Sequence, residues 1–190
     1  MRRGFKAEAE RLAEKVRTEM GRRPSDHVNA IDLATQVGAT VRAADELTSR
    51  EKLQTLEEIQ PGAFSACTFT IADRHVIVYN PMCSSPGRTQ SDIAHEVSHI
   101  MLEHDMKSVE TIAGFSFFTC DPEEEQEANW LGGCLLLPRR LLYLAARRGM
   151  GPSEIAEKYN VSEQMAAFRL RTTGVLRQLG AGAASPSPTS

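Results

Sequence analysis

The sequence predicts an α+β protein that is mainly helical, with a small antiparallel sheet and a C-terminal pair of helices resembling a helix-turn-helix unit. Three observations predict this. In several segments apolar residues recur at steps of three and four, as on one face of a helix. Residues 63–79 instead alternate and are rich in β-branched and aromatic residues, which is typical of strands. Residues 153–173 contain two short helical segments around Asn160-Val161.

Composition fits one globular domain with a core. The chain has 190 residues, of which 41% are hydrophobic and 25% charged. Its net charge of -3 argues against a protein that coats nucleic acid along its whole length. No apolar run approaches the roughly 18 residues that a membrane span needs. Met1 is followed by charged residues without an apolar stretch, so we expect no signal peptide, no membrane partner and a cytoplasmic location.

The first half of the chain should contain two helices, a short strand and a hairpin. These elements are expected at residues 5–20, 29–37, 40–42, and 63–71 with 75–79. Residues 72–74 read as the tight turn of the hairpin, and strand 75–79 is a candidate edge for pairing with another chain. The polar segment 45–61 fits either a short helix or a loop.

The second half should be helical. After a loop at 84–87, a helix is expected from Thr89 or Ser91 to about Glu103, followed by a linker with the apolar run 115–118. Asp121 is a good N-cap for the next helix, because its side chain can accept from free N–H groups. Further helices are expected at 122–137, 138–148, 153–159 and 162–173. From Gly180 the Gly, Ala, Ser and Pro content predicts disorder.

The motif His95-Glu96-Val97-Ser98-His99 carries the chemistry. Residues four apart share one face of a helix, so both imidazoles can reach one Zn²⁺ ion per chain. Glu96 can then accept a proton from zinc-bound water and later pass it to the leaving amine. The other helix faces are mostly apolar, and burying two histidines and a glutamate among them would be costly without a function.

A catalytic zinc site needs a third protein ligand. The acidic segment after Asp121 supplies it best through Glu125, with Asn129 four residues later as a supporting group on the same face. Three alternatives remain open for the third ligand. They are Glu127, Glu124 and His104.

Three blocks, 94–104, 125–130 and 135–138, together resemble the ImmA/IrrE family of metallopeptidases, and the likeness covers about residues 5–175. The resemblance implies a minimal zincin-type fold, similar to small thermolysin-like gluzincins. It implies His95, His99 and Glu125 as zinc ligands and Glu96 as catalytic acid/base. Family members cleave DNA-binding repressors, so a protein substrate, such as a helix-turn-helix repressor, is expected. The chain has Gly132-Gly133 where alanine is common in the family.

The domain division that follows is a zinc metallopeptidase domain at 1–150, helix-turn-helix-like helices packed on it at 151–178, and a disordered tail at 179–190. Between Arg139 and Gln178 there are eight Arg or Lys and three Glu, a local charge of +5. DNA contact through Gln164, Arg169 and Arg171 is therefore one interpretation of the helix pair. The sequence favours a structural or substrate-docking pair, because Glu163 would oppose phosphate. A DNA-binding regulator, or a partner-binding module with a vestigial or structural zinc site, is the alternative function.

Overall fold

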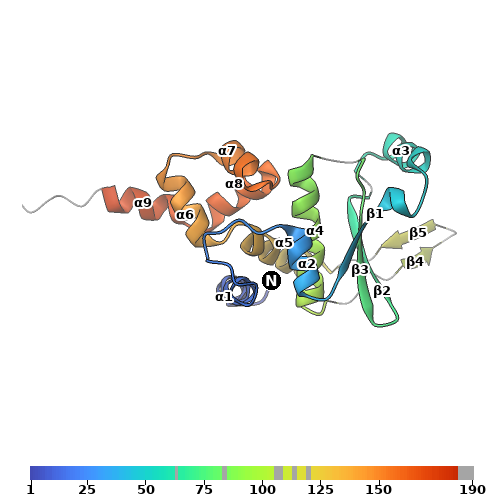
Figure 1. Cartoon of the computed structure of the whole chain (residues 1–190), viewed down its shortest axis with the longest axis horizontal. Helices are drawn as coiled ribbons and strands as arrows, with labels where there is room; N and C mark the ends of the chain where they lie inside the picture. The colour runs from blue at the N-terminus through green and yellow to red at the C-terminus, as the bar shows by residue number, and fades with distance from the viewer. Residues whose placement is uncertain (63, 83–84, 105–108, 113–114, 119–120, 184–190) are drawn as a thin grey trace, which may run out of the picture.

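Helix α4 (Pro86–Met101) occupies the centre of the molecule, between a three-stranded sheet and the C-terminal helices (Figure 1). The computed structural model describes residues 1–62, 64–82, 85–104, 109–112, 115–118 and 121–183. Helix α5 (Pro122–Leu136) packs against α4, and α1 (Phe5–Glu19) packs against α5. The predicted α+β class, mainly helical, is confirmed.

The sheet is mixed, with the strand order β1-β3-β2. β2 (Ala66–Ile71) and β3 (Arg74–Tyr79) form the predicted antiparallel hairpin. Its turn residues Ala72 and Asp73 have φ of 47° and 60°, as the favoured two-residue hairpin turn requires. β1 (Thr40–Ala43) pairs with β3 in parallel. β3 is therefore the central strand, and the expectation that strand 75–79 forms an edge is wrong.

The two faces of the sheet are covered differently. Ile77 of β3 joins the main core together with Ile93 and Val97 of α4. On the opposite face, Val78 packs with Leu53 of α3 (Arg50–Ile59). The segment 45–61, left open between helix and loop, is thus mainly helical. It begins with a short 3-10 turn at Ala44–Glu46.

The remaining helices largely follow the prediction. They are α2 (Ala30–Gln36), α6 (Arg139–Arg147), α7 (Pro152–Tyr159), α8 (Glu163–Thr172) and α9 (Val175–Ala183). α9 occupies part of the segment expected to be a disordered tail, and residues 184–190 lie outside the described residues. None of the described helices is long and apolar enough to cross a membrane.

Two local predictions differ from the structure. α4 begins at Pro86, earlier than expected, because the Ser85 side chain caps it by accepting from the Arg88 N–H, so part of the predicted 84–87 loop is the first helical turn. The expected linker contains an antiparallel pair, β4 (Val109–Ile112) and β5 (Phe115–Phe118). The rest of this linker, and residues 83–84, lie outside the described residues.

Two buried arginines satisfy the carbonyl groups at the end of α5. Arg17 of α1 donates to the Leu135 carbonyl at 2.7 Å and to the Leu136 carbonyl at 3.2 Å. Arg169 of α8 donates to the Leu137 carbonyl at 3.1 Å. Burial lowers the pKa of Arg17 to about 10, which leaves it charged at neutral pH. Helix α5 is therefore held by positive charge at its negative end, from two distant parts of the chain.

Candidate metal centre

Three side chains converge where α4 meets α5. The Nε2 atoms of His95 and His99 lie 3.0 Å apart, because the two residues are one helical turn apart on α4. A Glu125 carboxylate oxygen of α5 lies 3.2 Å from His95 Nε2, and the other lies 3.5 Å from His99 Nε2. The structure thus brings together the two predicted histidines and the preferred third residue.

Close packing of α4 and α5 makes this convergence possible. A Cβ added to Gly132 of α5 would lie 3.2 Å from the Ala94 carbonyl oxygen of α4, tighter than most side-chain contacts allow. Glycine at this position therefore lets the helices approach.

The donor set fits a zinc ion. Ligand bonds of about 2.0–2.1 Å in a tetrahedron would place donor atoms about 3.3 Å apart. The two imidazole nitrogens lie 3.0 Å apart, close to this value, and with one carboxylate oxygen of Glu125 as the third donor all three atoms lie within 4.8 Å of one another. Two imidazoles and one carboxylate are also a ligand set that catalytic zinc sites use, with a further position left for water or substrate.

His104 lies behind His99 instead of in the cluster. α4 ends at Met101, and Glu103 adopts a left-handed conformation with φ of 53°, which turns the chain back. His104 Nδ1 then lies 3.0 Å from His99 Nδ1, the ring nitrogen facing away from the cluster. Such an outer contact fixes the orientation of a ligating histidine. As an alternative third ligand, His104 is not brought into the cluster.

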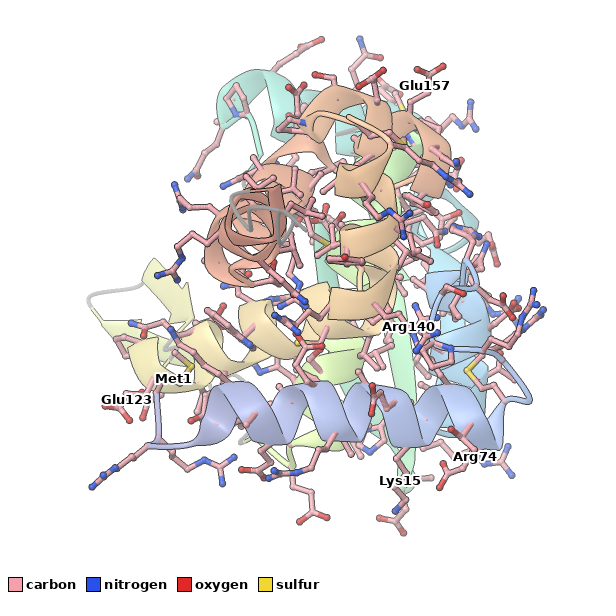
Figure 2. The ribbon with its side chains drawn as sticks, turned by 90° about the vertical axis from the view of Figure 1, so that its left-hand side faces the viewer. Met1, Lys15, Arg74, Glu123, Arg140 and Glu157 are labelled. Carbon is pink, nitrogen blue, oxygen red and sulfur yellow. The ribbon has the colours of Figure 1, made fainter. Side chains whose placement is uncertain are left out.

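Glu127 continues this chain of contacts away from the cluster. One of its carboxylate oxygens lies 3.9 Å from His104 Nε2, and the carboxylate accepts from the Arg2 backbone N–H at 2.8 Å and from Arg2 Nε at 3.1 Å. Figure 2 shows the adjacent Met1 beside Glu123, where the chain lies against the first turn of α5. Burial raises the pKa of Glu127, but Arg2 and His104 outweigh it and leave the pKa lowered. Glu127 therefore serves as an anion that holds His104 and Arg2.

Glu124 and Asn129 remain outside the three-residue cluster. Glu124 is not part of any metal-binding group among the described residues. Asn129 Nδ2 donates to the main-chain carbonyl of Glu125 at 2.8 Å, a contact within α5. This contact is to the backbone, and a supporting role of Asn129 toward the Glu125 carboxylate stays a prediction.

Glu96 is buried, with 4% of its surface exposed, and β2 holds it. The Thr68 hydroxyl donates to Glu96 Oε2 at 2.7 Å. No motif in the sequence marks Thr68 as a site residue. The alternation of β2 places Thr68 on one face of the strand, but only the packing of β2 on α4 brings it to Glu96.

A cleft of about 950 Å³ opens beside the cluster. His95, Glu96 and Glu125 line it, and helix α8 supplies further lining residues. Arg169, one of the three suggested DNA contacts, is fully buried and ion-paired with Glu10 at 2.6 Å, so that suggestion is wrong for Arg169. The other two, Gln164 and Arg171, line the cleft.

Comparison with known families supports a peptidase. The family model Peptidase_M78, described as IrrE N-terminal-like domain, matches residues 55–171. This range is more than half of the chain and includes the cluster, Glu96, Thr68, helices α4 to α7 and nearly all of α8. No curated protein matches the chain significantly.

Proposed function

Because this chain belongs to the Peptidase_M78 family of IrrE N-terminal-like domains, we propose that it is a zinc-dependent endopeptidase. One observation carries the proposal. His95, His99 and Glu125 converge beside the buried Glu96, and His95, Glu96 and Glu125 line a cleft of about 950 Å³. We propose His95, His99 and Glu125 as ligands of one zinc ion, and Glu96 as the catalytic acid/base.

The roles of the protein groups follow from their positions. A zinc ion held here would lower the pKa of a coordinated water to about 7. Glu96 accepts the proton from the attacking water and delivers it to the leaving amine. Thr68 keeps one carboxylate oxygen of Glu96 engaged at 2.7 Å, so the carboxylate is oriented before substrate binds.

The substrate is proposed to be a protein segment in extended form. β2 is an edge strand of the described three-stranded sheet, and its Ala66 lines the cleft. An extended peptide can add to such an edge through main-chain hydrogen bonds. A DNA-binding repressor or another regulatory protein as substrate is supported by the family resemblance alone.

The test combines metal analysis with cleavage of a proteome-derived peptide mixture. Glu96→Gln should keep about one zinc per chain and lose cleavage, because it removes the proton acceptor and leaves the ligands. His99→Ala and Glu125→Ala should both lose stoichiometric zinc. Glu124→Ala is the matched control, since it removes a neighbouring carboxylate outside the cluster. Full cleavage by Glu96→Gln would contradict the role of Glu96 as catalytic acid/base.

A further inference from the structure

Helix α8 turns one face into the peptidase cleft. Five of its residues line the cleft: Gln164, Met165, Ala167, Phe168 and Arg171. The opposite face is buried, with Ala166, Arg169 and Leu170 packed inside the protein. α8 is the second helix of the helix-turn-helix-like pair, which in DNA-binding proteins is the one that reads the duplex. Here its exposed face looks onto the proposed zinc site.

Tight contacts fix α8 in this position. A Cβ added to Gly87 of α4 would lie 2.4 Å from the Val161 carbonyl oxygen in the turn before α8. The Ser162 N–H donates to Ser91 Oγ of α4 at 2.9 Å. Arg169 fills the space beside Gly133 of α5. The face of α8 is therefore a preformed wall of the cleft.

Part of this wall is apolar. The rings of Trp130 on α5 and Phe168 on α8 pack edge to face, with centroids 5.4 Å apart and an interplanar angle of 84°. Met165 lies one turn before Phe168 and also lines the cleft. Together these side chains offer a surface for a large apolar side chain.

Arg171 adds an uncompensated positive charge one turn beyond Phe168. Its side chain is exposed, lines the cleft and has no ion-pair partner among the described residues. Arg88, the other arginine of the cleft, is paired with Asp92 at 3.2 Å. The Glu125 carboxylate is committed to the metal in the proposed function. Arg171 is therefore the cleft group that favours an acidic partner.

We propose that this cleft selects an extended peptide segment with a large apolar side chain and an Asp or Glu at a fixed distance from it. The apolar side chain packs on Met165, Phe168 and Trp130, and the carboxylate pairs with Arg171. This proposal rests on the proposed function and specifies its substrate class. It also assigns to α8 the role of a peptide-binding wall in place of DNA reading.

The test measures binding separately from cleavage. Zinc-loaded Glu96→Gln protein is titrated with fluorescent ten-residue peptide pools. Each pool has one Phe or Leu, and one Glu at a varied number of residues from it. Matching pools carry Gln or Lys in place of the Glu. Glu at one offset should tighten binding about two- to fivefold, as an exposed ion pair allows. Adding Arg171→Glu should abolish this preference or reverse it toward Lys.

Arg140→Glu is the matched control. Arg140 is exposed on α6, outside the residues that line the cleft, so the same charge change there should leave the preference intact (Figure 2). Phe168→Ala should remove the increase in affinity that the Phe or Leu of the peptide provides. It should keep the increase that the Glu provides. Circular dichroism of each variant shows whether it is folded.

The outcomes separate this inference from the proposed function. If the wild type cleaves peptides but no acidic preference depends on Arg171, the inference fails and the endopeptidase stands. If the Glu96→Gln protein binds Glu pools through Arg171 but the zinc-loaded wild type cleaves nothing, the endopeptidase fails and the cleft assignment stands. Binding of a 30-base-pair duplex that is lost in Arg171→Glu, without peptide binding, would overturn the inference in favour of DNA.

Discussion

The hydroxyl of Thr68 holds the Glu96 carboxylate through one hydrogen bond. The hydrogen bond goes to a charged group, so its loss should reduce the stabilisation of the oriented Glu96 carboxylate by about 1.5–3 kcal/mol. We expect Thr68→Val to lower kcat about tenfold or more with little change in KM. Steady-state kinetics on a peptide cleaved by the wild type would measure both constants.

The conservative variant separates positioning from folding. Thr68→Ser keeps the hydroxyl and should restore most of kcat. Equal losses in Thr68→Ser and Thr68→Val, or a loss confined to KM, would contradict a role in orienting Glu96.

His104 acts one contact further from the proposed metal. It meets the outer nitrogen of His99 at 3.0 Å, and partners of this kind typically change metal affinity 10–100-fold when they are removed. His104→Ala should therefore weaken zinc binding by that factor in a competition titration with a chelator. His75→Ala is the control, since His75 lies on β3 and contacts Thr70 instead. Unchanged affinity in His104→Ala would rule out this supporting role.

Spacing along the chain explains which site residues were predictable. His95, Glu96 and His99 form a local pattern, and Glu125 follows from the acidic turn of a second helix. Thr68 and Arg2 are 28 and 125 residues away from their carboxylate partners, so no local pattern reveals them. His104 was found, but as a ligand candidate. Its outer position depends on the left-handed turn at Glu103, which the sequence does not mark with glycine.

At the level of elements, local signals predicted most helices and the hairpin. The Asp121 cap and the positive-φ turn at Ala72 and Asp73 are both short-range features. The parallel pairing of β1 with β3 joins segments about 36 residues apart, and no local turn motif predicts it. The start of α4 was misplaced because Pro86-Gly87 resembles a turn, although proline is also favoured in a first helical turn.

The contact between α4 and the turn before α8 has no spare room. Gly87→Ala would place a Cβ 2.4 Å from a backbone carbonyl oxygen, which cannot move like a flexible side chain. We expect the free energy of unfolding to fall by about 1–3 kcal/mol, the usual cost of overpacking. Urea denaturation measures this change. Gly180→Ala in α9 meets nothing within 4 Å and should be neutral or stabilising, and equal effects at both positions would refute the packing argument.

For the molecule as a whole, a bound metal would join two helices whose ligands are far apart in sequence. A ligand that binds only the folded state adds about 4 kcal/mol of stability at a thousandfold excess over its Kd. For a chain of this size that corresponds to a Tm change on the order of 10 °C. Chelation should therefore lower the Tm of the wild type by that order and leave His99→Ala nearly unchanged. Calorimetry with and without a chelator checks this, and an unaffected wild type would contradict a folding-linked zinc site.

The arginine contacts at the end of α5 have a consequence for biosynthesis. Arg17 is synthesised before α5. Arg169, the second arginine that donates to the end of α5, is synthesised 32 residues after its partner Leu137. The α8 wall of the cleft arrives in the same late segment. A growing chain would carry both histidines and Glu125 well before it has a finished cleft. The cleft is therefore complete only after the C-terminal helices have been made and have docked.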